Sequence, residues 1–179
     1  MIFKETKLAG AFVIEQNFFE DVRGFFAQCW SAREFAEQGL NPRLVECNFS
    51  YNRRKGTLRG MHFQSAPHAQ AKLVRCTAGA IYDAIIDLRP ESETFKQWVG
   101  VELTAKNYRM LYVPEGFAHG FQTLDDDTEV LYQVSDVFAP ELAGGVRWDD
   151  PAFGIEWPDN GGDERIIIAR DREYTDFNS

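Results

Sequence analysis

The chain has 179 residues, of which 44% are hydrophobic and 14% are aromatic, and its formal net charge is −9 at pH 7. This length suits a single domain, residues 1–179, with one buried core, and the apolar content excludes a disordered chain. Non-specific nucleic-acid binding needs a basic surface that neutralises phosphates, so the negative charge argues against that function. A small phosphorylated ligand held by a few converging basic residues stays compatible with this composition.

The cysteines are Cys29, Cys47 and Cys76, an odd number without any Cys-x-x-Cys spacing. This pattern argues against both a disulfide framework and a zinc site. No apolar run approaches the roughly 18 residues that a membrane helix needs, and the N-terminus lacks the apolar segment of a signal peptide. We therefore expect a soluble, cytoplasmic protein that neither spans nor binds a membrane.

The first strand is expected over residues 10–16, followed by a connection over residues 17–21 and an aromatic segment over residues 23–30. In the aromatic segment, Arg23 stands beside Gly24. A glycine lets the backbone approach a ligand, and an arginine offers a planar fork to phosphate oxygens. The segment is therefore a candidate phosphate contact, although aromatic strands usually belong to a core.

A single helix is predicted with conviction, starting at a Ser-x-x-Glu capping box formed by Ser31 and Glu34. Beyond it the chain changes to short, regularly spaced runs separated by glycine and proline, which indicates an all-β sandwich or barrel. The expected strands are residues 43–51, 57–64, 71–77, 80–88, 95–104, 108–114, 117–123 and 128–137. The tail, residues 143–179, is expected to pack on this body through Trp148 and Trp157.

Two of these strands carry a histidine. Period-two alternation over residues 57–64 places Arg59 and His62 on opposite faces, and His119 follows in the glycine-rich strand 117–123. Histidine changes charge near neutral pH, which suits it to proton transfer, but a lone strand histidine is more often structural. The two strands together predict one shared pocket.

Proton transfer is the chemistry that this pocket favours. His62, Lys72 on the next strand and Tyr132 on the strand after His119 supply a base, a cation and a phenol. Moving a proton on a carbon beside a carbonyl needs these three groups: a base to remove it, a positive charge for the enolate oxygen, and an acid to return it. From the residues alone, the structural alternative, a solvated Lys72 and a half-buried Tyr132, is the simpler interpretation.

Several motifs in consistent order from about residue 10 to residue 171 resemble the dTDP-4-dehydrorhamnose 3,5-epimerase family. They are Asp21-x-Arg23-Gly24-x-Phe26, Leu58-Arg59-Gly60-Met61-His62-Phe63-Gln64, Ala71-Lys72-Leu73-Val74-Arg75, Asp87-Leu88-Arg89, Pro114-Glu115-Gly116-Phe117-Ala118-His119-Gly120-Phe121, Trp148-x-Asp150-Pro151 and Ile155-Glu156-Trp157-Pro158. The resemblance implies a cupin-type jelly roll with one or two short helices, and a homodimer with strand exchange. It also implies an epimerase without metal or organic cofactor, which inverts carbons flanking the ketone of a nucleotide-linked 4-keto-6-deoxyhexose.

The resemblance assigns catalytic roles to four residues. His62 resembles the general base, Tyr132 the acid that delivers a proton from the other face, and Lys72 the group that stabilises the enolate. Asp171 stands where the family has the carboxylate that orients the histidine. The implied substrate contacts are Arg23 and Arg59 at the pyrophosphate, Phe19 and Phe26 at the same end, Asn48 and His119 near the sugar, and Arg170 beside Asp171.

A bound metal is not expected. Pro114-x-Gly116-x-x-His119 matches the second half of the cupin metal motif, but the first half lacks its His-x-His pair, because Gln64 stands two residues after His62. The chain has only three histidines in all, and no Gly-x-Ser-x-Gly elbow marks a hydrolase.

The departures from the family pattern lie at the expected nucleotide and sugar contacts. Gln28 replaces a usual Glu, Glu46 an amide, Phe138 a Tyr that stacks near the base, and Ala143 a Glu. Because Gln both accepts and donates hydrogen bonds, a thymine and a cytosine nucleotide both stay open. A carboxylate at Glu46 only accepts hydrogen bonds, which affects how the sugar is presented to His62.

Three functions are therefore compared. The leading one is the 3,5-epimerase, dTDP-4-dehydro-6-deoxy-D-glucose to dTDP-4-dehydro-L-rhamnose. The second is an epimerase that inverts C3 only or C5 only, on a related or differently based nucleotide sugar. The third is a non-catalytic cupin that binds a nucleotide sugar, which the combination of His62, Lys72 and Tyr132 argues against, because binding alone needs no acid and base together.

Overall fold

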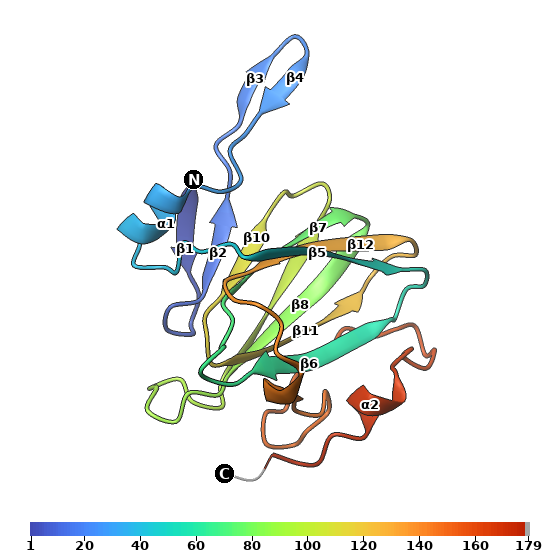
Figure 1. Cartoon of the computed structure of the whole chain (residues 1–179). Coiled ribbons are helices and arrows are strands. Elements are labelled where there is room, and N and C mark those ends of the chain that lie inside the picture. The colour runs from blue at the N-terminus through green and yellow to red at the C-terminus, as the bar shows by residue number, and fades with distance from the viewer. Residues whose placement is uncertain (178–179) are drawn as a thin grey trace.

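Two antiparallel β-sheets face each other and enclose the main core (Figure 1). The computed structural model describes residues 1–177. Nearly all of its regular structure is β, and the helices are two short α-helices, α1 (Ala32–Glu37) and α2 (Ala169–Arg172), and one 3₁₀ turn (Pro140–Leu142). The all-β, jelly-roll fold class that we predicted is confirmed. No helix in this part of the chain is long and apolar enough to cross a membrane.

The strands form two large sheets and one hairpin. In spatial order, the six-stranded sheet contains β1 (Ile2–Glu5), β2 (Phe12–Glu15), β10 (Met110–Val113), β7 (Lys72–Ala78), β12 (Thr128–Val134) and β5 (Glu46–Asn52). The five-stranded sheet contains β13 (Ala143–Gly145), β6 (Leu58–Gln64), β11 (Phe117–Thr123), β8 (Ala80–Asp87) and β9 (Trp98–Thr104). The hairpin pairs β3 (Phe19–Asp21) with β4 (Gly24–Phe26).

Side-chain alternation explains how the sheets pack, and β8 shows it clearly. Ile81 and Ile85 belong to the core between the sheets, whereas Ala84 and Ile86 belong to a separate cluster on the outer face of the five-stranded sheet. Successive side chains of a strand point to opposite faces, so a strand with buried residues on both faces is covered on both sides. The five-stranded sheet is therefore a middle layer.

The chain after β13 supplies the outer cover of that sheet. Val146 and Phe153 are buried against it, and the partly buried Trp157 joins the same cluster. The indole N–H of Trp157 donates to the Trp148 carbonyl at 2.8 Å, which satisfies the polar end of a large apolar side chain. The tail packs on the body through Trp157, as we expected.

Helix α1 covers the far side of the six-stranded sheet. The Ser31 hydroxyl accepts a hydrogen bond from the Glu34 backbone N–H, so the capping residue predicted from the sequence is confirmed. Phe35 is buried and packs against Ile14, Leu73 and Tyr112 in a third cluster.

Five elements were not predicted, namely β1, β3, β13, α2 and the 3₁₀ turn Pro140–Leu142. The connection expected over residues 17–21 is wrong, because β3 lies there and pairs with β4 in an exposed hairpin that projects from the sheets (Figure 1). The edge strand β1 and helix α2 were also missed. Helix α2 has four residues and no side-chain cap, so it lacks the signal that identified α1.

Candidate active site

His62 and Arg59 lie on the same face of β6, so the sequence-based expectation of opposite faces is wrong. In the pairing of β6 with β11, His62 stands opposite His119 and Arg59 stands opposite Phe121. Three steps along β6 thus match two steps along β11, which is a β-bulge. Directly opposed residues share a face, and Phe121 belongs to the core between the sheets. The bulge therefore turns Arg59, His62 and His119 toward the six-stranded sheet.

Two glycines allow this bulge. Gly60 has φ +134, a region that side chains avoid, and a Cβ placed on it would lie 2.5 Å from the Gly120 Cα. The backbones of β6 and β11 thus approach where the register shifts.

The six-stranded sheet presents the complementary side chains. Tyr132 packs against the core between the sheets, and its directly opposed neighbour on β5 is Asn48. Lys72, at the start of β7, donates from Nζ to the His62 carbonyl at 3.4 Å, so it reaches across to β6. Arg59 also spans the two sheets, because its Nε donates to Asn52 Oδ1 at 2.7 Å. The structure therefore brings the expected base, cation and phenol to facing strands.

The Asp171 carboxylate orients His62. Its Oδ1 lies 2.9 Å from His62 Nε2, and its Oδ2 accepts the Gly60 N–H at 3.2 Å. Arg170 flanks this pair, with Nε donating to Asp171 Oδ1 at 3.0 Å and Nη2 3.1 Å from His62 Nε2. Because Nε2 faces a carboxylate oxygen, we assign the neutral ring's proton to Nε2, which leaves Nδ1 as the basic nitrogen.

The burial of His62 favours a neutral imidazole. Burial lowers the pKa of His62 most, the bond and charge of Asp171 oppose this, and the positive charges of Lys72 and Arg170 lower it further. For Asp171, burial acts to raise the pKa, but the hydrogen bonds from His62, Gly60 and Arg170 prevail, and the net pKa is lowered. At neutral pH the pair is therefore a neutral histidine bonded to a carboxylate, the form that can accept a proton.

Lys72 and Tyr132 are also perturbed by burial. Loss of solvation lowers the pKa of Lys72 from 10.5 to about 8, against the opposing charge of Asp83. Burial raises the pKa of Tyr132, which Glu46 reinforces and Arg59 opposes. Near pH 7 the lysine is therefore a cation and the tyrosine a protonated hydroxyl, as proton donation requires.

Asp83 is a site residue that we did not predict. It is fully buried on β8, and its Oδ1 lies 2.7 Å from Nε2 of the buried His119. No hydrogen-bond partner meets its Oδ2 among residues 1–177, which is unusual for a buried carboxylate. The sequence held a signal, since alternation along β8 aligns Asp83 with the core residues Ile81 and Ile85. An acidic side chain among the core-facing residues of β8 needs a hydrogen-bond or charge partner inside the protein.

Phe19, Arg23 and Phe26 are not brought to these side chains. They lie on the projecting hairpin (Figure 1), where Phe19 and Phe26 are 66% and 70% exposed. Arg23 Nη2 donates to Asp21 Oδ2 at 2.5 Å. No hydrogen bond among the described residues joins the hairpin to Arg59 or His62. One chain alone therefore does not unite the two expected pyrophosphate ligands.

Three of the four positions that depart from the family pattern are exposed, and the fourth, Glu46, lies near enough to Tyr132 for its charge to act on it. Gln28 is exposed in the segment between β4 and α1, and Ala143 is exposed on β13. The exposed Phe138 donates its backbone N–H to Glu46 Oε1 at 3.1 Å, so Glu46 holds the segment that follows β12. An amide oxygen at position 46 could accept the same bond.

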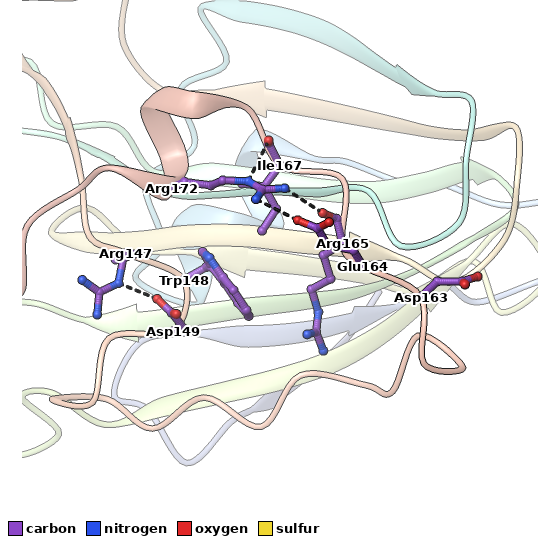
Figure 2. A pocket seen from close by; sticks show the side chains of 8 residues that line it. All are labelled: Arg147, Trp148, Asp149, Asp163, Glu164, Arg165, Ile167 and Arg172. Carbon is purple, nitrogen blue, oxygen red and sulfur yellow. Dashed lines mark hydrogen bonds and ion pairs between the residues drawn. The ribbon is translucent and has the colours of Figure 1, made fainter.

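A separate cleft is lined by residues of the tail and not by His62. Figure 2 shows its lining, which includes Arg147, Trp148, Arg165 and Arg172. Arg147 pairs with Asp149, Arg172 pairs with Glu164, and the Arg165 guanidinium lies 5.1 Å from the centre of the Trp148 ring. These arginines already have partners, and none of the expected site residues lines the cleft. Over residues 1–177, no group of three or more His, Cys, Asp or Glu side chains could hold a metal ion.

Comparison with known proteins identifies the family of the chain. The family model of dTDP-4-dehydrorhamnose 3,5-epimerase matches residues 5–179. The dTDP-4-dehydrorhamnose 3,5-epimerase of Salmonella typhimurium is 45% identical over 159 residues, which cover 88% of this chain and 86% of the relative. The crystal structure of the Elizabethkingia anophelis enzyme of that name superposes with a TM-score of 0.95 at 37% identity and covers 99% of this chain and 96% of its own.

A third relative carries a ligand. The dTDP-6-deoxy-D-glucose-3,5-epimerase of Legionella pneumophila was crystallised in complex with dTDP-4-keto-L-rhamnose. It superposes with a TM-score of 0.87 at 36% identity and covers 95% of this chain and 89% of its own. Sequence and fold agree, and the chain belongs to the dTDP-4-dehydrorhamnose 3,5-epimerase family.

Proposed function

We propose that the protein converts dTDP-4-dehydro-6-deoxy-D-glucose to dTDP-4-dehydro-L-rhamnose by inverting C3 and C5. The observation that carries this proposal is His62 on β6, bonded to Asp171 of α2, opposite Lys72 and Tyr132 on the six-stranded sheet. His62, oriented by the buried Asp171 carboxylate, can remove a proton, and the protonated phenol of Tyr132 can donate one. The relatives named above support the choice of sugar nucleotide.

The ketone at C4 decides which bonds react. Removal of a proton from C3 or C5 leaves the electron pair conjugated with the ketone, so negative charge collects on the C4 oxygen. His62 Nδ1 takes the proton, and the Lys72 ammonium stabilises the enolate oxygen. Tyr132 then returns a proton to the opposite face of the same carbon, which inverts it. Each inversion consumes one proton and releases one, and no electrons are exchanged.

Asp171 and Arg59 have supporting roles in this proposal. The Asp171 carboxylate keeps the proton on Nε2 and stabilises the imidazolium that forms after proton abstraction. Arg59 lies on the same face as His62 and offers its guanidinium to the diphosphate, for which a planar fork of donors is suited. Asn48 and His119 flank Tyr132 and His62 and are the proposed contacts of the sugar, with Arg170 beside them.

The projecting hairpin suggests that two copies build each site. The hairpin exposes Phe19 and Phe26 together with the fully exposed Val22, and monomers seldom leave such apolar groups uncovered. We propose a homodimer in which the hairpin of one protomer brings Phe19, Arg23 and Phe26 to Arg59 of the other. Gln28 and Phe138 would then meet the nucleotide base. This arrangement explains why the proposed diphosphate ligands lie apart within one chain.

A complementation experiment tests the shared site. Arg23→Ala and His62→Asn each inactivate the enzyme, and the two variants are mixed, unfolded and refolded together. If Arg23 acts in trans, a mixed dimer holds one site with both native residues, and roughly a quarter of the wild-type activity returns. If Arg23 serves its own chain, the mixture stays inactive.

The reaction itself is tested by proton NMR. The protein is incubated with dTDP-4-dehydro-6-deoxy-D-glucose in deuterium oxide, and the signals of C3–H and C5–H are followed. Loss of both signals and formation of the L-rhamno product support the 3,5-epimerase. Loss of only one signal identifies a single-centre epimerase, and binding without any exchange identifies a non-catalytic protein.

We also propose that the protein works in the cytoplasm. Cys29, Cys47 and Cys76 are all free thiols, which suits a reducing compartment. Detection of the protein in a cell fraction other than the cytoplasm would contradict this location.

A further inference from the structure

Gly145 leaves a gap directly beside His62. The two residues are opposed in the pairing of β13 with β6, so a side chain at position 145 would stand on the same face as the imidazole. A glycine there offers no atoms to cover the imidazole from the β13 side.

Tyr174, from the segment after α2, fills this gap. A Cβ added to Gly145 would lie 2.4 Å from the ring carbons of Tyr174, so the ring occupies the place of the missing side chain. The rings of Tyr174 and His62 lie edge to face, with centroids 6.4 Å apart and planes at 72°. Tyr174 is itself half-buried, and burial raises the pKa of its hydroxyl. The tail thus supplies Asp171 to one nitrogen of the imidazole and Tyr174 to its open side.

We propose that Tyr174 is a positioning residue for the reaction, whose ring closes the β13 side of His62 to water and holds the imidazole against Asp171. This inference rests on the assignment of His62 as the base. It predicts that the pKa of His62 depends on the ring of Tyr174 and not on its hydroxyl.

Several charged or titratable groups face His62, and removal of Tyr174 leaves them in place. They are Asp171 and Arg170 from α2, Lys72 from β7 and His119 from β11, with Tyr132 on β12 of the facing sheet. Burial is the largest cause of the lowered pKa of His62. Opening the β13 side to water leaves all these charges in place and reduces the burial. The imidazolium then becomes easier to form, so the pKa of His62 rises toward the ordinary histidine value.

The chain has only three histidines, so the imidazole signal of His62 can be followed individually by NMR. The imidazole signals of the full-length protein are titrated by NMR in the wild type, Tyr174→Ala, Tyr174→Phe and Gly145→Ala. We expect the His62 titration to move to higher pH in Tyr174→Ala and in Gly145→Ala, whose added methyl displaces the ring. Tyr174→Phe should restore the wild-type titration.

Kinetics should follow the same shift. The acidic limb of kcat/KM should move to higher pH, so that the activity of Tyr174→Ala relative to the wild type is about threefold lower at pH 6 than at pH 8. Phe177→Ala is the matched control, because Phe177 anchors the same tail against Phe153, with ring centroids 5.2 Å apart. It should leave the acidic limb in place.

The outcomes separate the two hypotheses. If the His62 titration does not move in either Tyr174→Ala or Gly145→Ala, or moves equally in Phe177→Ala, Tyr174 does not cover His62 and the inference fails. If the titration moves but the acidic limb does not follow it, Tyr174 covers His62 and the assignment of His62 as the base fails instead.

Discussion

His62 and His119 lie directly opposite each other on β6 and β11, and each imidazole is bonded through Nε2 to a different buried carboxylate. Asp171 holds His62 from the tail, and Asp83 holds His119 from β8. The first pair joins segments far apart in the sequence, so the reactive geometry depends on how the tail packs. Lys72 lies between these systems, because it bonds to the backbone of His62 and is influenced by the charge of Asp83.

Replacement of Tyr132 by Phe should separate proton removal from inversion. The change deletes only the hydroxyl, so His62 still abstracts the proton, but no donor returns one to the opposite face. In deuterium oxide, exchange into the substrate should then continue while net inversion falls on the order of a hundredfold or more. Tyr82→Phe is the matched control, since Tyr82 packs near Trp157 on the outer face of the sheet. Full epimerase turnover in Tyr132→Phe would show that another group is the acid.

The pH profile of kcat/KM should fall at basic pH because Lys72 loses its proton there. A lysine is charged below its pKa, and burial lowers the pKa of Lys72 to about 8. As pH rises through this value, Lys72 loses the charge that stabilises the enolate, and kcat/KM should fall. A profile that stays flat to pH 10 would contradict this role for Lys72.

Asp83→Asn should move the basic limb of the kcat/KM profile toward lower pH. The carboxylate raises the pKa of Lys72 against the effect of burial, so a neutral Asn lets this pKa fall below about 8. Asp87→Asn is the control, because Asp87 is also a buried acid of β8 but bonds to Arg89, Ser92 and Thr94. It should cost stability and leave the limb in place. An unmoved limb in Asp83→Asn would mean that its charge does not act on Lys72.

Gly60→Ala should destabilise the protein strongly. The new Cβ would meet the Gly120 Cα at 2.5 Å and would hold an alanine at φ +134, which together cost at least about 2 kcal/mol. Gly161→Ala is the control, because Gly161 also has a positive φ, +71, but open space around its Cα. Urea unfolding measures both variants. Equal losses of unfolding free energy in the two variants would show that the close approach of Gly60 to Gly120 does not contribute to the destabilisation.

The sequence predicted what local patterns determine. Alternation located the long strands, the cap at Ser31 located α1, and the glycine-flanked histidines pointed to one shared site. It failed where the structure depends on distant partners. The bulge opposite His119 reverses the face of Arg59, and counting residues along β6 alone cannot detect it.

Two other residues show the same limit. Phe26 belongs to an aromatic segment of the kind that usually forms a core strand, and Phe19 to an expected connection, yet both lie on an exposed hairpin. Their expected role needs a second copy of the chain, which a single sequence does not place.

The central claim is that His62 removes the proton, and its most direct test is deuterium exchange by His62→Asn. The variant is incubated with the 4-keto sugar nucleotide in deuterium oxide, and calorimetry with the product nucleotide checks that binding survives. We expect binding near the wild-type level and a loss of exchange at both carbons by about a hundredfold to ten-thousandfold. A variant that binds and still exchanges deuterium at the wild-type rate would show that another residue is the base.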